Sequence, residues 1–538
     1  MSLFNLPTAD APLGPKNGGT AAYDKMIVQP VSQPGGANAL VSGTAVNFRF
    51  RSDSSKYINY RESRLYCRWS VAIGPPQNAA GDAAAGAARS RSTLPPNLRM
   101  AACPNSACFG GGAKYTLNGT VVENMPDRYY EVACANLWAK QDGSGETAGS
   151  NGLLTRDKRM RVARDNNSSR ATGNITLDGG RLPAKQAIIR LAHNKAVQTG
   201  AEEFEIEEPI HLASFNGSTQ LCGPSDHELE FIVATHAGKD MFFSQDMIVD
   251  YDNNAAVVQH HAYRDVKLVG AGGFPAAGAF AAGTVYVCLR HVEAHIAYIS
   301  PQMATIPASV SNRFSEYFIT TRALDSDAPQ LQVVVPSSTR QIWIGMRQNH
   351  HDVRMDREEL SKATGEIDEY GATQATGAGA AATRPLGWTN LQCRLGTASA
   401  PVIPFSNLDV RTGKFSRVFN EALSICGKPN GLRATEWSYD DFCGQTSANG
   451  AFYPDTADQV LGDIRSTVMG DMGGLVMLRL ITPPGSMDNT LFIDGKLRAF
   501  NPGAKQEIVI IAVHEQRVAM TYAAPQELPI STVKTAVI

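Results

Sequence analysis

Short runs in which apolar and polar residues alternate recur along this chain. The first is 46–51, where Val46, Phe48 and Phe50 alternate with polar residues, and 65–73 repeats the pattern. Because successive side chains of a strand point to opposite faces of a sheet, this period of two predicts strands with one buried face. The feature therefore favours an all-β fold.

A hairpin is predicted over 113–122, because Asn118-Gly119 separates two strand-like segments and favours a tight primed turn. Helical spacing predicts only two helices, 126–139 and 457–469. Many short strands with few helices favour β-sandwiches or jelly rolls over the core of an α/β enzyme. Further strand-like runs are 204–215, 228–234, 266–269, 284–299, 313–321, 330–335, 340–347, 391–403, 474–481, 490–500 and 507–520.

The chain is too long for one ordinary hydrophobic core. Its 538 residues predict two or more domains, and a hydrophobic content of 43% allows each domain a sizeable core. Segments 78–91, 270–283 and 371–383 are rich in Ala and Gly and contain almost no large side chains. We expect them to be long surface loops that contribute little to the core.

Net charge and targeting patterns restrict the possible partners. A formal net charge of -2 removes the general attraction to nucleic acid, so we expect no direct sequence-specific contact with it. No run of 18 apolar residues predicts a transmembrane segment, and no secretory signal is recognised at the start. Nine scattered cysteines are typical of free thiols in a protein made in a reducing compartment.

Four groups of ligand-type residues are candidate metal sites. Solvated or interface loops explain the histidine groups better, and the aspartate group lacks the glycine and terminal glutamate of an EF-hand, which leaves a bound calcium as the weaker alternative. Phosphate-loop, α/β-hydrolase and zincin motifs are absent. We therefore predict no catalytic, cofactor-binding or metal residues and no enzyme activity. The groups are His350, His351, Asp352, Asp356, Glu358 and Glu359; His260 and His261; Asp246, Asp250 and Asp252; and Cys103 and Cys108.

The order of these motifs resembles a known family. The segments that carry the resemblance are 46–50, 57–60 and 63–69 in an opening strand pair, 113–120 with 127–130 as a hairpin and short helix, 206–212 and 228–232 as paired late strands, and 473–479, 495–500 and 508–515 as closing strands. Together they cover about half of the chain and resemble the double jelly-roll major capsid proteins of icosahedral DNA viruses, of the Polinton-like virus, virophage and adintovirus type. The segment 325–470 departs from that pattern, so its strand layout is left open.

The resemblance implies an all-β fold of two tandem jelly-roll sandwiches with few short helices and long surface loops. It predicts an N-terminal arm at 1–40, a first jelly roll at 41–305, a second at 306–525 and a C-terminal tail at 526–538. It further implies homotrimers that tile an icosahedral virion shell beside neighbouring capsomers, minor capsid proteins and penton proteins. The virion would then be the location of a protein made in the host cell.

A different class of protein uses the same strand pattern. A viral attachment protein or a carbohydrate-binding β-sandwich is the alternative, and an exposed aromatic platform would favour it. A β-rich glycoside hydrolase or lyase would need paired acids in a cleft, which a linear pattern does not reveal.

Overall fold

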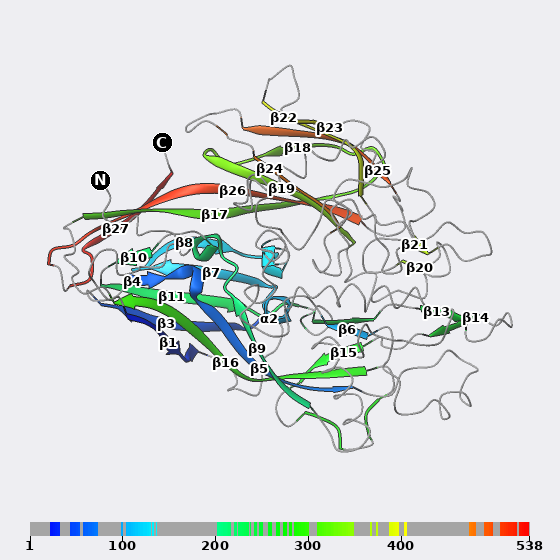
Figure 1. The fold of residues 1–538 in the computed structure, drawn as a ribbon, viewed down its shortest axis with the longest axis horizontal. Helices are drawn as coiled ribbons and strands as arrows, with labels where there is room; N and C mark the ends of the chain where they lie inside the picture. The colour runs from blue at the N-terminus through cyan, green and yellow to red at the C-terminus, as the bar shows by residue number, and fades with distance from the viewer. Residues whose placement is uncertain are drawn as a thin grey trace.

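The computed structural model in Figure 1 consists mainly of β-strands in the residues that it describes. It describes residues 22–32, 43–53, 57–73, 98–100, 104–130, 132–133, 136, 202–216, 220–222, 224–235, 237, 241–244, 247–250, 257–260, 265–269, 273–276, 279–281, 284–300, 309–348, 366–367, 373–374, 387–396, 403–405, 473–479, 482, 489–498, 506–524 and 527–536.

Two sheets form the first sandwich. One has the order β10-β4-β16-β5-β9, with β1 and β15 also paired to β16, and the other has the order β2-β3-β11-β7-β8. Their strands are β1 (Ala22–Val28), β2 (Pro30–Ser32), β3 (Ala45–Ser52), β4 (Tyr57–Asn59), β5 (Arg64–Ile73), β7 (Gly112–Leu117), β8 (Thr120–Met125), β9 (Glu202–Pro209), β10 (Gln220–Cys222), β11 (Ser225–Ile232), β15 (Asp265–Leu268) and β16 (Thr284–Ser300).

Two further sheets form the second sandwich. One has the order β17-β26-β19-β24, with β27 also paired to β26, and the other has the order β18-β25-β22-β23. Their strands are β17 (Ser309–Ala323), β18 (Gln330–Val334), β19 (Thr339–Gln348), β22 (Gly387–Leu395), β23 (Ile403–Phe405), β24 (Gly473–Arg479), β25 (Thr490–Arg498), β26 (Gln506–Thr521) and β27 (Ser531–Ala536).

Short elements complete the described part of the chain. Three strand pairs lie apart from the sandwiches: β6 (Leu98–Met100) with β12 (Phe242–Ser244), β13 (Met247–Asp250) with β14 (Val257–His260), and β20 (Glu366–Ile367) with β21 (Thr373–Gln374). The helices with defined bounds are η2 (Tyr60–Glu62), α2 (Pro104–Cys108) and α6 (Ala213–Asn216), and residues 129–130, 132–133 and 136 are helical as well. Among the described helices, none is long and apolar enough to cross a membrane.

Burial along the strands follows the alternation that predicted them. In β11, Ser225, His227, Leu229 and Phe231 are buried while their neighbours are partly or fully exposed. The predicted hairpin is confirmed as β7 and β8, and its turn residues Asn118 and Gly119 have φ of 49° and 78°. Positive φ at both central residues is the geometry that a primed turn requires.

Three predicted elements differ from the structure at their ends. The run 204–215 is not one strand, because β9 ends at Pro209 and Ala213–Asn216 is helical. The run 391–403 is also divided, since β22 ends at Leu395 before Gly396, whose φ of 58° leaves the extended region. The helix predicted over 126–139 first becomes helical at Tyr129, three residues after Pro126.

One predicted loop contributes to the core after all. The Ala- and Gly-rich segment 270–283 includes Phe280, which is buried and packs edge to face on Tyr286 with ring centroids 5.6 Å apart. Phe274 of the same segment packs against this cluster too, so two large side chains anchor the loop on β16. The predicted helix 457–469 and the loop 78–91 lie outside the described residues.

Candidate functional site: the seam and the polar outer face

The predicted ligand groups do not assemble into a site in the described part of the chain. Among the residues described, no group of three or more His, Cys, Asp or Glu side chains could hold a metal ion. His260 and Asp250 lie at opposite ends of the register between β13 and β14. Cys108 is a buried cysteine in α2. The remaining candidates, His261, Cys103, Asp246, Asp252 and the group from His350 to Glu359, lie outside the described residues.

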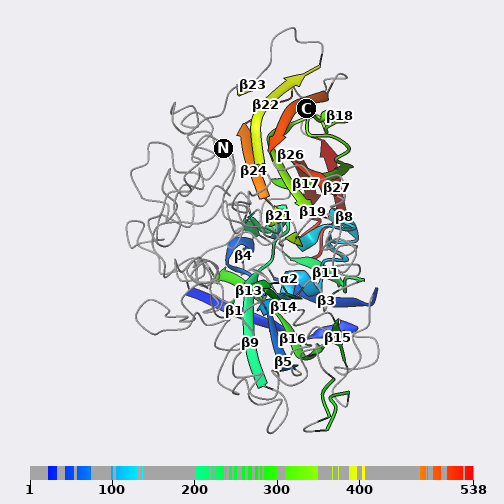
Figure 2. The same cartoon turned by 90° about the vertical axis from the view of Figure 1, so that its right-hand side faces the viewer.

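The two sandwiches instead meet in a seam, at which β8 of the first faces β17 and β27 of the second. Figures 1 and 2 both place the second sandwich above the first along this junction. Tyr60 and Phe314 pack edge to face across it, with ring centroids 5.8 Å apart, and both side chains are almost fully buried. One hydrophobic cluster contains buried residues of both sandwiches. The two halves therefore share a core.

Polar contacts fix the register of the two halves. Tyr317 donates to Asn136 Oδ1 at 2.9 Å, and Thr120 Oγ1 donates to the carbonyl of Thr532 at 3.1 Å. Arg128 and Glu507 form an ion pair across the seam at 3.6 Å. Because these bonds are directional, they restrict sliding that apolar packing alone would permit.

Two buried carboxylates cap the N-termini of the short helices α2 and α6 in the first sandwich. Glu208 on β9 accepts from the backbone N–H groups of Asn105 and Ser106 at 2.8 and 2.9 Å, at the start of α2. Glu123 on β8 accepts from the backbone N–H groups of Ala213 and Ser214, both at 2.9 Å, at the start of α6. Each carboxylate thus replaces the hydrogen-bond partners that a first helical turn lacks.

A chain of hydrogen bonds runs through the interior of the first sandwich, from η2 through β7 and β11 to β3. Tyr60 and Tyr115 share a bond of 2.8 Å between their hydroxyls, Tyr115 bonds His227 Nδ1 at 2.9 Å, and Ser52 bonds His227 Nε2 at 3.0 Å. Burial lowers the pKa of His227 to about 3, so its imidazole is neutral. The network provides hydrogen-bond partners for these buried polar groups, which is a structural role.

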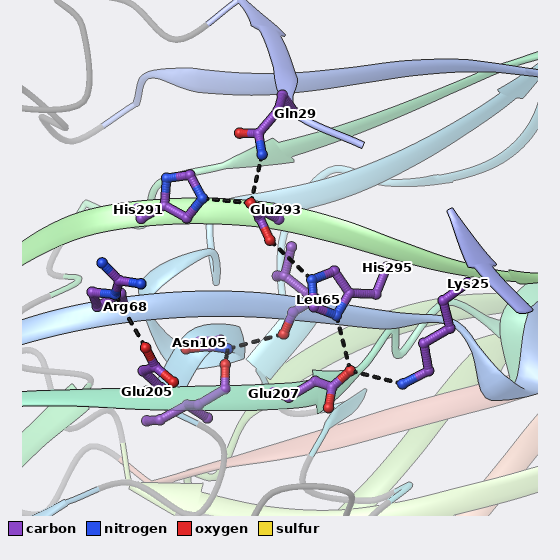
Figure 3. Close-up of polar contacts among 11 residues, drawn as sticks. Lys25, Gln29, Leu65, Arg68, Asn105, Glu205, Glu207, His291, Glu293 and His295 are labelled. Atoms are coloured by element: carbon purple, nitrogen blue, oxygen red, sulfur yellow. Dashed lines mark hydrogen bonds and ion pairs between the residues drawn. The ribbon is translucent and has the colours of Figure 1, made fainter. Parts of the chain in front are cut away.

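Titratable side chains also gather on the outer face of the β1, β16, β5 and β9 sheet, as Figure 3 shows. His295 lies between two carboxylates: its Nδ1 is 3.1 Å from Glu207 and its Nε2 is 3.0 Å from Glu293. Glu293 also binds His291 at 2.6 Å, and Lys25 reaches Glu207 at 3.2 Å. We call Lys25, Gln29, Glu207, His291, Glu293 and His295 the outer cluster.

Neither the seam nor the outer cluster was found by sequence reasoning. The residues of the outer cluster come from β1, β9, β16 and the junction after β1, and Lys25 is 182 positions from Glu207. The only local signal was the repeat His291, Glu293, His295 on one face of β16. Two tryptophans that might have formed an aromatic platform, Trp69 and Trp343, are buried.

Comparison with solved structures gives whole-length likenesses. The chain is similar to a chain in the cryo-EM structure of the Sputnik virophage, with 11% identity, a TM-score of 0.51, and coverage of 100% of this chain and 93% of that one. The mavirus major capsid protein aligns with 9% identity over 99% of this chain and 94% of its own, with a TM-score of 0.46. The Faustovirus major capsid protein aligns with 8% identity over 93% and 90%, with a TM-score of 0.40.

No protein-family profile matches the sequence, and no curated protein matches it. At such low identity the likeness concerns the fold, which the two pairs of packed sheets bear out independently. The chain therefore has the all-β double jelly-roll fold that its resemblance to major capsid proteins predicts.

Proposed function

We propose that this chain is a structural protein of a virion shell, the major capsid protein of an icosahedral DNA virus, and that its role is assembly and not catalysis. The observation that carries the proposal is the likeness to the virophage chain, which covers 100% of this chain and 93% of that one. A likeness confined to one sandwich would apply equally to many β-sandwich proteins with unrelated functions.

The seam supports this proposal. A shell protein contacts its neighbours at opposite edges, so its two halves must not hinge relative to one another. The shared core of the two sandwiches meets that need. The polar contacts between the halves, such as that of Tyr317 with Asn136, add a fixed register. An attachment protein would need an exposed recognition platform, and the described tryptophan side chains are in the interior.

The proposal includes a homotrimer with a pseudo-hexagonal outline, located in the virion beside neighbouring capsomers, minor capsid proteins and penton proteins. Within it we place the arm at 1–40, the first jelly roll at 41–305, the second at 306–525 and the tail at 526–538. The boundary near 305 is supported by the sheet order, because β16 ends at Ser300 in the first sandwich and β17 begins at Ser309 in the second. Strand β1 pairs with β16, and β27 pairs with β26, so arm and tail both add strands to their sandwiches.

Light scattering on the purified full-length protein tests the assembly state. We expect a species of about three times the chain mass of 57.7 kDa. Three copies of a two-sandwich chain supply the six sandwiches of a pseudo-hexagonal particle. Negative-stain images should show hexagonal particles. A protein that stays monomeric at high concentration, with single rounded particles, would contradict the proposal and favour the attachment-protein alternative.

A further inference from the structure

The outer cluster contacts the edge strand β1. Its residues Ala22–Val28 pair antiparallel with Ala294–Ser300 of β16, and among the described strands it pairs with no other. Lys25 extends from β1 to Glu207 on β9, and Gln29, which follows β1, donates to Glu293 on β16. The carboxylates that anchor the side chains of this edge segment are thus the same two that hold His295.

Both ring nitrogens of His295 face carboxylate oxygens, at 3.1 and 3.0 Å. A neutral imidazole carries only one N–H, and an ionised carboxylate only accepts, so a neutral ring can donate to Glu207 or to Glu293 but not to both. The two bonds form together only when the ring is protonated. Its ring also stacks on Tyr66, with centroids 5.2 Å apart and planes 12° apart, which fixes the orientation that both bonds require.

We propose that His295 with Glu207 and Glu293 forms a proton-dependent latch that holds the N-terminal strand β1 on the first sandwich. When the ring loses its proton, two carboxylates on neighbouring parts of the sheet lose the positive charge between them. Their mutual repulsion then favours turning outward into water. The bonds of Lys25 with Glu207 and of Gln29 with Glu293 would be lost in that arrangement. Strand β1 would keep its backbone pairing with β16 and the packing of Met26 and Val28 on the core.

The two nearest arginines form hydrogen bonds with other groups, although the charge of Glu207 also acts on Arg64. Arg64, its partner in the register between β16 and β5, donates to the carbonyls of Arg61 and Ser63 and pairs with Glu62. Arg68 binds Glu205 at 3.2 Å. Figure 3 shows the charged groups Lys25 on β1, Arg68 on β5, Glu205 and Glu207 on β9, and His291 and Glu293 on β16 around His295. The other titratable groups of this region are Arg61 and Glu62 on η2 and Arg64 and Tyr66 on β5.

The direction of the pH response follows from these contacts. The hydrogen bond with Glu207 raises the pKa of His295 above its usual 6.5, against the opposing effect of burial, and the bond with Glu293 adds to the rise. The latch is therefore complete below pH 6.5 and is lost as the pH rises through the raised value. At the acid end, burial would raise the pKa of Glu293, but bonds from His291 and His295 outweigh it and lower the pKa to about 2, so that part of the latch is lost only near that pH.

Hydrogen-deuterium exchange on the purified full-length protein tests the latch. Protection of β1 amides, corrected for intrinsic rates and compared with β11, is measured from about pH 5.5 to about pH 8.5, the range in which histidine titrates. In the wild type we expect opening of β1 to increase about tenfold for each pH unit by which the pKa of His295 is raised. In His295→Gln, β1 should be weakly protected at both pH values.

Two further variants keep the test decisive. His514→Gln on β26, far from β1 in the fold, should keep the wild-type response, and Glu207→Gln should move the midpoint to lower pH because one of the two carboxylates is gone. An unchanged protection of β1 between the two pH values in the wild type would overturn the proposal. So would a response that survives in His295→Gln and disappears in His291→Gln, because the titrating group would then be His291.

Discussion

Glu208 shows how much a single buried side chain contributes to this fold. It is fully buried, and besides two backbone N–H groups of α2 it accepts from Ser106 Oγ at 2.8 Å. The same helix carries Asn105, whose side chain donates to the carbonyls of Leu65 and Ile206 and accepts from Trp69 Nε1. Through α2, one carboxylate therefore stabilises the junction of β5 and β9.

Replacing Glu208 with Ala should lower the free energy of unfolding by at least about 2 kcal/mol, because two buried N–H donors lose their acceptor. Urea unfolding followed by fluorescence measures the loss. A matched control is Glu205→Ala on the same strand, whose carboxylate is largely exposed and pairs with Arg68. That change should cost at most about 1 kcal/mol. Equal losses in the two variants would show that the cap is unimportant.

Glu123 provides a pH-dependent prediction at the same scale. Burial raises its pKa to about 7, against the hydrogen bonds from Ser214 and Ala213, while the unfolded chain titrates near 4.5. Between pH 4.5 and about 7 the folded protein therefore holds a proton that the unfolded chain has lost. The stabilisation that this proton provides falls as the pH rises through that interval. Glu123→Gln cannot titrate. The unfolding free energy of the wild type, relative to that of this variant, should fall as the pH rises across that interval. A difference that stays constant would contradict the raised pKa.

The hairpin of β7 and β8 is the element that joins the two sandwiches most directly. Asn118 in its turn accepts from the backbone N–H of Asp226 at 2.8 Å and donates to Thr532 Oγ1 at 3.3 Å. The turn thus contacts the start of β11 in its own sandwich and β27 in the other. Its local geometry, set by Asn118 and Gly119, is consequently a condition for the seam.

Two glycines at the ends of β7 should respond differently to alanine. A Cβ at Gly119 meets nothing within 4 Å, so Gly119→Ala should cost only the backbone strain of its φ of 78°, about 1–2 kcal/mol. A Cβ at Gly112 would lie 2.7 Å from the carbonyl oxygen of Met125, and φ there is 142°. Gly112→Ala should therefore lower the melting temperature by more than Gly119→Ala. Thermal unfolding by circular dichroism compares them, and the reverse order would contradict the predicted clash at Gly112.

At the scale of the whole molecule, we expect the shared core to make the two sandwiches unfold as one cooperative unit. Buried residues on both sides of the seam belong to one cluster, and Phe314 of the second sandwich contacts Tyr60 of the first. Neither sandwich would keep its apolar surface covered if the other unfolded. This coupling is what the proposed role in a shell requires.

Phe314→Ala should lower the free energy of unfolding by about 3–5 kcal/mol, because a large buried side chain is removed from the seam. Calorimetry should still show a single transition at a lower temperature. Val334→Ala on β18, where the side chain is 67% exposed, serves as the control and should stay within about 0.5 kcal/mol of the wild type. Separate transitions for the two halves, in the wild type or in Phe314→Ala, would contradict the idea of one cooperative unit.

The sequence by itself determined many of the long strands, their buried faces and the hairpin, but not the end strands β1 and β27. Alternation over 46–51 placed Phe48 and Phe50 in the core, and Asn118-Gly119 placed the turn, because both signals depend only on neighbouring residues and on the geometry of an extended chain. The double jelly roll was also predicted, but through resemblance to a family. The metal-ligand groups lead to no site in the described residues.

The tertiary structure alone decided which distant residues meet. The helix at Ala213–Asn216 interrupts a run that looked like one strand, because Glu123, 90 positions earlier, supplies the acceptor for its first N–H groups. Similarly, His295 titrates between Glu207 and Glu293 only because the sheet order places β16, β5 and β9 side by side. Local periodicity specifies which face of a strand is buried but not which strand lies next to it, and so the seam and the outer cluster required the fold.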